Sequence, residues 1–283
     1  MTKVEFIKIE TNGVRIHMAV SGPTKGPLII LLHGFPEFWY GFRKQIEPLV
    51  KAGYRVVVPD QRGYNFSEKP EKIENYTLDQ LARDVIGIIQ FFKREKACII
   101  GHDWGGLVAW HLASYHGQYV DKLIVINSPH PLVMMKCYVP IQWVRSLYIL
   151  FFQMPNVPEQ LLKARKYALL ANVLKRTSKE GTFSHDELEN YKESWSNSRA
   201  ISSMINWYRA LRKDLRLISE SPKVQVPVQI LWGQKDVFLA KGLAKRSLQY
   251  CTDGSLVLIS ATHWVQHEQP LIVNQLILEF LKS

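Results

Sequence analysis

Cys98-Ile-Ile-Gly-His-Asp-Trp-Gly-Gly106 is the stretch that decides how the whole chain is interpreted. A short apolar run, typical of a strand buried on both faces, leads directly into small residues and then into a helical pattern. The pattern Gly101-x-Asp103-x-Gly105 predicts a sharp strand–turn–helix junction with Asp103 at its tip, because residues without bulk let strand and helix approach closely. The alternative is that Asp103 only caps the following helix.

Apolar runs and helical patterns alternate around this segment. Strands that alternate with helices predict a mostly parallel sheet that is covered on both faces. The predicted strands are 4–9, 14–20, 27–32, 54–59, 97–100, 122–126, 228–232 and 255–259, with a hairpin around Asn12-Gly13, and helices are expected at 105–116 and 270–281.

The alternation stops in the middle of the chain. From Pro129-His-Pro131 to about Pro222 the sequence carries helix signals and no convincing strand. Thr77-Leu-Asp-Gln80, before this stretch, and Ser184-His-Asp-Glu187, within it, have the pattern of capping boxes that begin helices. We therefore predict an α/β core of about eight strands from residues 1–130 and 223–283, with a helical cap inserted at 131–222.

The composition is that of a globular protein. Of the 283 residues, 47% are hydrophobic and 22% are charged, which suffices for a core without metal or disulfides. The formal charge is +11, but no nucleic-acid motif accompanies it, so the basic residues are interpreted as a solvated face. Three separated cysteines (Cys98, Cys137 and Cys251) and a start without an apolar leader favour a cytoplasmic protein. Val139 to Pro158 is expected to be a buried amphipathic helix, or else a sticky surface, and not a membrane span.

Polar residues also follow other predicted strands. His33-Gly-Phe-Pro-Glu37 comes after the strand at 27–32, and backbone N–H groups in such a loop can face a ligand. Asp236 ends the segment Trp232-Gly-Gln-Lys-Asp236, and His263 follows the last strand. Open α/β sheets place their sites at the carboxyl ends of strands, so Asp103, Asp236 and His263 are expected to meet as nucleophile, acid and base.

The other histidines are assigned supporting or structural roles. His33 is expected to hold its loop, and His102 should point away from Asp103 although it is the preceding residue. The remaining six lack a matching partner in the sequence and are expected in the core or on the surface: His17, His111, His116, His130, His185 and His267.

These residues resemble the α/β-hydrolase superfamily, and more closely the soluble epoxide hydrolase family. The resemblance covers essentially the whole chain and implies the α/β-hydrolase fold, with Phe35 and Trp104 as the backbone donors of an oxyanion hole. It also implies two cap tyrosines, which match Tyr208 and Tyr148, with Tyr138 as the fallback for Tyr148. The matching pieces are His33-Gly-Phe-Pro-Glu37, Asp60-Gln-Arg-Gly-Tyr64, Gly101-His-Asp-Trp-Gly-Gly106, Asn127-Ser-Pro-His-Pro131, Gly233-Gln-Lys-Asp236, His263 and Asn206-Trp-Tyr-Arg209.

Epoxide chemistry explains why these residue types are needed. A carboxylate such as Asp103 attacks a saturated carbon without first losing a proton, because it ionises at about pH 4, and the resulting ester can be hydrolysed. The phenols of Tyr148 and Tyr208, with a pKa of about 10, would bind the epoxide oxygen and one would protonate it. His263, oriented by Asp236, would then activate water, and the product would be a vicinal diol.

Glu37 is expected to order the attacking water, and these steps need no metal and no cofactor.

Other interpretations of the same residues remain open. Haloalkane dehalogenases also use an Asp nucleophile, but many have an asparagine where Phe35 stands, although Trp143 or Trp207 could hold a halide instead. Fluoroacetate dehalogenases have an arginine where Trp104 stands. An esterase-like activity, or a catalytically idle binding module, is a further alternative.

The substrate and the assembly are only loosely constrained. The expected partners are an apolar epoxide and water, with no nucleic acid, and the chain is expected to be a monomer or a homodimer. An apolar and aromatic pocket is suggested by residues that core packing would explain equally well: Phe151, Phe152, Trp143, Met204 and Trp207.

Overall fold

An eight-stranded sheet forms the centre of the molecule. In the computed structural model, which describes residues 3–136, 140–217 and 222–283, the strand order is β1-β2-β4-β3-β5-β6-β7-β8. Strands β1, β2 and β4 pair antiparallel, and the pairs from β4 through β8 are parallel. The bounds are β1 Glu5–Thr11, β2 Val14–Ser21, β3 Leu28–Leu32, β4 Arg55–Pro59, β5 Ala97–His102, β6 Val120–Ile126, β7 Val228–Gly233 and β8 Gly254–Ile259. The predicted α/β class is confirmed.

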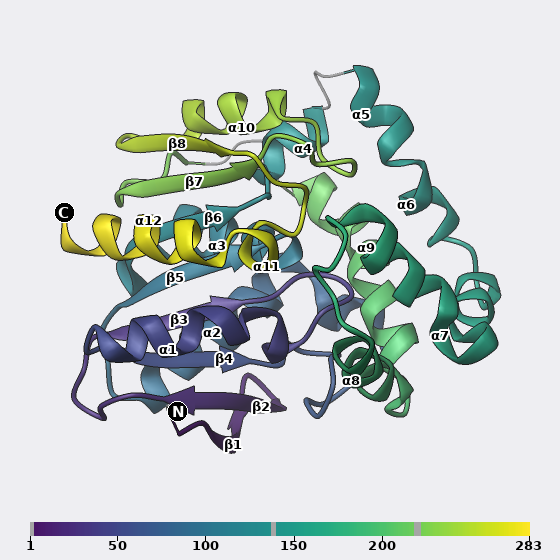
Figure 1. Cartoon of the computed structure of the whole chain (residues 1–283), viewed down its shortest axis with the longest axis horizontal. Coiled ribbons are helices and arrows are strands. Elements are labelled where there is room, and N and C mark those ends of the chain that lie inside the picture. Colours follow the sequence, from purple (N-terminus) through teal and green to yellow (C-terminus); the bar gives the residue numbers. More distant parts are fainter. Residues whose placement is uncertain (1–2, 137–139, 218–221) are drawn as a thin grey trace.

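Helices cover both faces of this sheet (Figure 1). Successive side chains of β3 explain the two layers, because Ile30 and Leu32 join one buried cluster while Ile29 and Leu31 join the other. Helices α2 and α3 pack in the first cluster, and α1 and α12 pack in the second. The core helices are α1 Arg43–Lys51, α2 Leu78–Phe91, α3 Trp104–Tyr115, α10 Gly242–Ser247, α11 Val265–Glu268 and α12 Pro270–Lys282, and the 3₁₀ turns are η1 Trp39–Phe42, η2 Ile73–Tyr76, η3 Gly117–Tyr119 and η4 Leu248–Tyr250.

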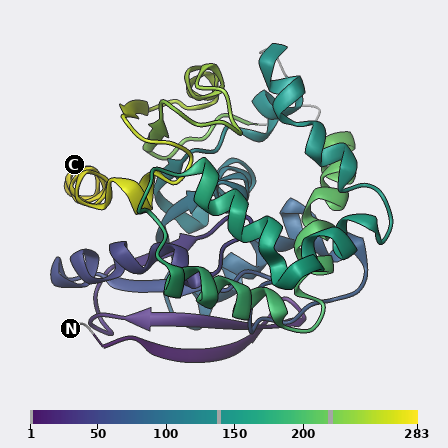
Figure 2. The same cartoon turned by 45° about the vertical axis from the view of Figure 1, so that its right-hand side comes forward.

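The described residues between β6 and β7 form six helices. They gather on one side of the core in both views (Figures 1 and 2). Their contacts fix that side: the indole of Trp195 donates to the carbonyl of Pro36, and the indole of Trp207 donates to the carbonyl of Arg62. Because Pro36 and Arg62 follow β3 and β4, these helices stand over the carboxyl ends of the strands. The bounds are α4 Pro131–Lys136, α5 Pro140–Arg145, α6 Leu147–Phe151, α7 Val157–Thr177, α8 His185–Ser196 and α9 Ala200–Leu217.

Helix starts agree only in part with the capping patterns. Ser184 and Glu187 form the predicted capping box at the start of α8. The box predicted at Thr77 is wrong, because its side chain accepts no hydrogen bond from α2; its hydroxyl donates to the carbonyl of Glu74 instead, at 3.4 Å. A preceding 3₁₀ turn, which the sequence pattern did not indicate, supplies that competing acceptor.

The apolar window before α7 differs from the expected buried helix. It contains two short helices, α5 and α6, whose side chains at Trp143, Val144 and Leu150 are each about two-thirds exposed. The alternative of an apolar surface is the one the structure shows. Cys98 and Cys251 are buried free thiols, whereas Cys137 and Tyr138 lie outside the described residues. Among the described helices, none has the length and apolar character that crossing a membrane would require.

Candidate active site

The junction between β5 and α3 has the predicted sharp form. Asp103 sits between the two elements with φ +52° and ψ −119°, a strained backbone for a residue with a side chain. Gly105 permits the close approach, because a Cβ there would lie 2.0 Å from the carbonyl oxygen of Leu32. The side chain of Asp103 makes no capping bond to α3, so helix capping does not explain this residue.

The carboxylate of Asp103 is held by the loop after β3. The backbone N–H of Phe35 donates to Oδ1 at 2.9 Å, as expected of a donor that faces the site. The other oxygen, Oδ2, lies 3.6 Å from Nε2 of His263, and 19% of the Asp103 side chain is exposed. One oxygen is therefore fixed by the backbone, and the other faces the imidazole.

Asp236 orients the imidazole from the opposite side. Nδ1 of His263 lies 2.8 Å from Oδ2 of Asp236, and Asn127 donates to the same oxygen at 2.6 Å. The backbone N–H groups of Phe238 and Leu239 donate to Oδ1 at 2.7 and 2.9 Å. Sequence reasoning gave Asn127 no role, although its position just past the end of β6 was the available signal.

Charge and burial set the protonation of this pair. Burial raises the pKa of Asp236, but His263 and the hydrogen bonds outweigh it and hold that pKa below its ordinary value. Burial also lowers the pKa of His263, yet the carboxylates of Asp236 and Asp103 prevail and raise it to about 8. The imidazole is therefore poised to exchange a proton near neutral pH.

Two tyrosines face Asp103 across a cavity of about 350 Å³. Tyr148 comes from α6 and Tyr208 from α9, and their ring centroids are 5.8 Å apart. Burial, followed by neighbouring groups that include Asp103, raises the pKa of both phenols above 10, so both remain protonated donors. Helices that are distant in sequence thus place two tyrosines in the wall of the cavity that Asp103 also lines.

The rest of the cavity is apolar. α7 has a break at Ala164–Tyr167, and leucines on both sides of this break reach the cavity wall. Of the expected lining residues, Phe151 and Phe152 are present; Trp143 is instead 66% exposed, and Met204 and Trp207 are packed in the core. The described lining residues are Phe35, Pro36, Asp103, Tyr148, Phe151, Phe152, Leu161, Leu162, Leu169, Leu170, Val173, Tyr208, Phe238, His263 and Trp264.

Glu37 does not line this cavity. The hydroxyl of Tyr191 donates to Oε1 at 2.6 Å, the amide of Gln266 donates to Oε2 at 3.1 Å, and Nε2 of His267 lies 2.7 Å from Oε1. Burial raises the pKa of Glu37, but His267 and His102 outweigh it, so the carboxylate stays ionised. With both oxygens engaged by the protein, this placement does not support the expectation that Glu37 orders the attacking water.

Histidines outside the site have partners that sequence reasoning missed. His33 accepts a hydrogen bond from the N–H of Gln61 at 3.0 Å and so joins the loops after β3 and β4, as expected of a loop-holding residue. His102 binds the carbonyl of His263 at 3.0 Å. The histidines found beside carboxylates are His17 with Asp60, His102 and His267 with Glu37, and His111 and His116 with Asp79. These pairs join distant segments, so spacing gave no signal for them.

Comparisons with known proteins agree with this architecture. The family described as "alpha/beta hydrolase fold" matches residues 27–270. The chain is 50% identical to the AB hydrolase superfamily protein YfhM of Bacillus subtilis, over 99% of this chain and 98% of that protein. It is 37% identical to human epoxide hydrolase 4, over 98% of this chain and 78% of that protein.

Solved structures place the chain among the same proteins. The Bacillus megaterium epoxide hydrolase, crystallised with an inhibitor, superposes with a TM-score of 0.88 at 30% identity, covering 98% of this chain and all of the other. Epoxide hydrolase A from Mycobacterium thermoresistibile gives a TM-score of 0.85 at 29% identity, with 99% of each chain covered. The fold is that of an α/β hydrolase, and the chain belongs to the epoxide hydrolase family within that superfamily.

Proposed function

We propose that the protein hydrolyses an apolar epoxide to a vicinal diol through a covalent ester on Asp103. The observation that carries this proposal is the arrangement around one cavity: a carboxylate, two protonated phenols and an oriented imidazole within otherwise apolar walls. Relatives named epoxide hydrolases, which match nearly all of this chain, support the same reaction.

In the first step, Oδ2 of Asp103 attacks a carbon of the epoxide. Oδ1 is occupied by the N–H of Phe35, so the free oxygen is the nucleophile. The new C–O bond forms as the ring C–O bond breaks, and the departing oxygen takes a proton from Tyr148 or Tyr208. Their raised pKa values ensure that this proton is present at neutral pH.

In the second step, water attacks the carboxyl carbon of the Asp103 ester. Nε2 of His263 accepts a proton from that water, and Asp236 stabilises the imidazolium that forms. Negative charge develops on Oδ1, where the N–H of Phe35 already points and where the N–H of Trp104 is the second expected donor. The ester bond then breaks as its leaving oxygen takes the proton held by His263, and the diol leaves. The second proton of the water returns to the tyrosine, so that Asp103 is a carboxylate again.

The cap tyrosines favour an epoxide over a halide as substrate. An opening epoxide needs a proton on its oxygen, whereas a departing halide needs none. The side chain of Phe35 stands at the cavity wall, where its ring contacts that of Tyr208 at 5.3 Å between centroids. An apolar ring at this position offers no side-chain donor to a halide.

Trapping the ester tests the proposal directly. A His263→Gln protein mixed with styrene oxide should gain one substrate mass, on a peptide that contains Asp103, because water is no longer activated. The matched control, His263→Gln combined with Asp103→Asn, should gain none. Bromide release from a bromoalkane would instead identify a dehalogenase, and an unmodified protein that binds the epoxide would refute the covalent mechanism.

The tyrosines are tested separately from the ester chemistry. In Tyr208→Phe, formation of the ester should slow by roughly 100-fold or more, while hydrolysis of an ester already formed changes little. Stopped-flow mixing with styrene oxide resolves the two steps. Equal slowing of both would show that Tyr208 only supports the fold.

A further inference from the structure

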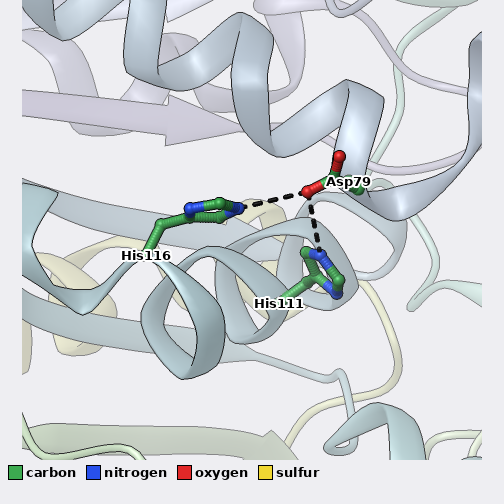
Figure 3. A group of neighbouring side chains, drawn as sticks. All are labelled: Asp79, His111 and His116. Atoms are coloured by element: carbon green, nitrogen blue, oxygen red, sulfur yellow. Dashed lines mark hydrogen bonds and ion pairs between the residues drawn. The ribbon is translucent and has the colours of Figure 1, made fainter. Parts of the chain in front are cut away.

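A second group of ionisable side chains lies at the other end of α3. Asp79, in the first turn of α2, faces His111 on α3 and His116 immediately after it (Figure 3). His111 and His116 follow Asp103 by eight and thirteen residues, which at 1.5 Å per residue places them about 12 and 20 Å along the axis of α3 from Asp103. This group is therefore separate from the proposed epoxide site.

The three side chains converge on one point. Nε2 of His116 lies 3.2 Å from Oδ1 of Asp79, and Nε2 of His111 lies 3.9 Å from the same oxygen. One potential ligand atom from each of the three residues lies within 4.8 Å of the others. Ligands around a tetrahedral zinc ion with bonds of about 2.0–2.1 Å stand about 3.3 Å apart, so the first distance fits and the second requires a small closure.

His111 brings a buried imidazole nitrogen to this point. Only 9% of its side chain is exposed, and its Nδ1 is buried without a hydrogen-bond partner among the described residues. Its Nε2, at 3.9 Å from Asp79, is too distant for a hydrogen bond. Nε2, the nitrogen that faces Asp79, therefore has no partner of hydrogen-bond length in the described part of the chain and can take an ion, which would leave Nδ1 as it is.

Arg83 binds one oxygen of Asp79 and leaves the other, Oδ1, available to an ion. Its Nε donates to Oδ2 at 2.7 Å, on the other side of the carboxylate from Oδ1. Such an outer partner is usual for a ligating carboxylate and fixes its orientation. The Asp79 side chain is 44% exposed and that of His116 is 20% exposed, so an ion and a water ligand can reach the site.

We propose that Asp79, His111 and His116 bind one divalent transition-metal ion of the zinc type. Two imidazoles and one carboxylate are ligands for zinc and its neighbours, whereas magnesium and calcium prefer oxygen ligands. Water completes the coordination. The ion joins the beginning of α2 to the end of α3 on one face of the sheet, and its role is to stabilise these two helices.

Metal binding to the full chain tests this site. After treatment with a chelator, equilibrium dialysis against ZnCl₂ should give one zinc per chain, and Co²⁺ should give a visible d–d band without a thiolate charge-transfer band. Asp79→Asn and His116→Gln should each weaken binding by more than about 100-fold, since even loss of an outer partner costs about 10–100-fold. His185→Gln, at the exposed start of α8, is the matched control and should bind normally.

Two further measurements distinguish zinc bound by Asp79, His111 and His116 from zinc bound elsewhere in the protein. His263→Gln should keep its zinc, because the proposed ligands lie at the opposite end of α3. At a hundredfold excess over Kd, zinc should raise the Tm of the wild type by ~5 °C and that of His116→Gln by much less. Equal binding by wild type and both ligand variants, loss of zinc in His263→Gln, or no binding by the wild type would each overturn the proposal.

Discussion

The two steps of the proposed reaction should depend differently on pH, because different groups titrate in them. Ester formation needs an ionised Asp103 and a protonated tyrosine, and the tyrosine pKa values lie above 10. Ester hydrolysis needs a neutral His263, whose pKa is raised to about 8. From pH 6 to 9, ester formation should stay nearly constant while hydrolysis rises.

The size of the rise follows from the imidazole. In the free enzyme, with a pKa of about 8, ~1% of His263 is neutral at pH 6 and about half at pH 8. Asp103 loses its charge in the ester, which lowers that pKa, so the hydrolysis rate constant should rise by less than ~50-fold over this range. Single-turnover stopped-flow with styrene oxide, at several pH values, measures both rate constants. A flat hydrolysis profile over this range, or a parallel rise in ester formation, would refute the assignment of His263 as the base.

Removing the carboxylate of Asp236 should shift the midpoint of the pH profile of ester hydrolysis to lower pH. In Asp236→Asn, burial remains while the largest opposing influence on His263 is lost, so its pKa should fall below the ordinary 6.5. The difference from about 8 corresponds to about 2 kcal/mol. The hydrolysis limb should therefore shift to lower pH while its plateau falls, because the imidazole loses its orientation. An unchanged midpoint would show that Asp236 does not control the imidazole.

The contribution of His263 to the free energy of unfolding should fall as the pH rises, whereas the rate of ester hydrolysis should increase. The pKa of His263 is about 8 in the folded state and 6.5 ordinarily, so proton binding stabilises the fold fully below pH 6.5. This contribution is lost as the pH rises through about 8, where hydrolysis becomes fast. Comparing urea midpoints of the wild type and His263→Gln at pH 6 and 9 measures it, and a wild-type advantage that grows with pH would contradict the sign.

Two substitutions test the loops that carry the site. In Gly34→Ala, the added Cβ would lie 2.4 Å from the Cβ of Asp103, so one of the two must move and the rate of ester formation should fall by about 100-fold. Gly117→Ala is the control, because a Cβ there would have no atom within 4 Å. Equal rates of ester formation in the two variants would contradict the argument. Arg62→Met removes the buried guanidinium that donates to both oxygens of Asp84 at 2.6 and 2.8 Å. Urea unfolding should show that the free energy of unfolding falls by about 3–5 kcal/mol, because the carboxylate of Asp84 is left buried without its partner. A fall of less than about 1 kcal/mol would show that the pair adds little to stability.

The order of local patterns along the chain predicted the architecture and the candidate reacting groups. Continuous apolar runs predicted the strands, and glycines on either side of Asp103 predicted its turn, because both effects act over a few neighbouring residues. The same edge of a parallel sheet then had to receive Asp103, Asp236 and His263. The local competition at Thr77 shows the limit of such patterns, since a 3₁₀ turn replaced the expected cap.

Only the tertiary structure decided which side chains meet across long separations. The engagement of Glu37 by Tyr191 and His267, and the convergence of His111 and His116 on Asp79, depend on how helices pack, which no spacing in the sequence encodes. Local conformation is governed by sterics and hydrogen bonds within a few residues, so it can be predicted from the sequence. Pairing between distant charged groups depends on the packing of the whole core, so it emerges only when the chain is folded.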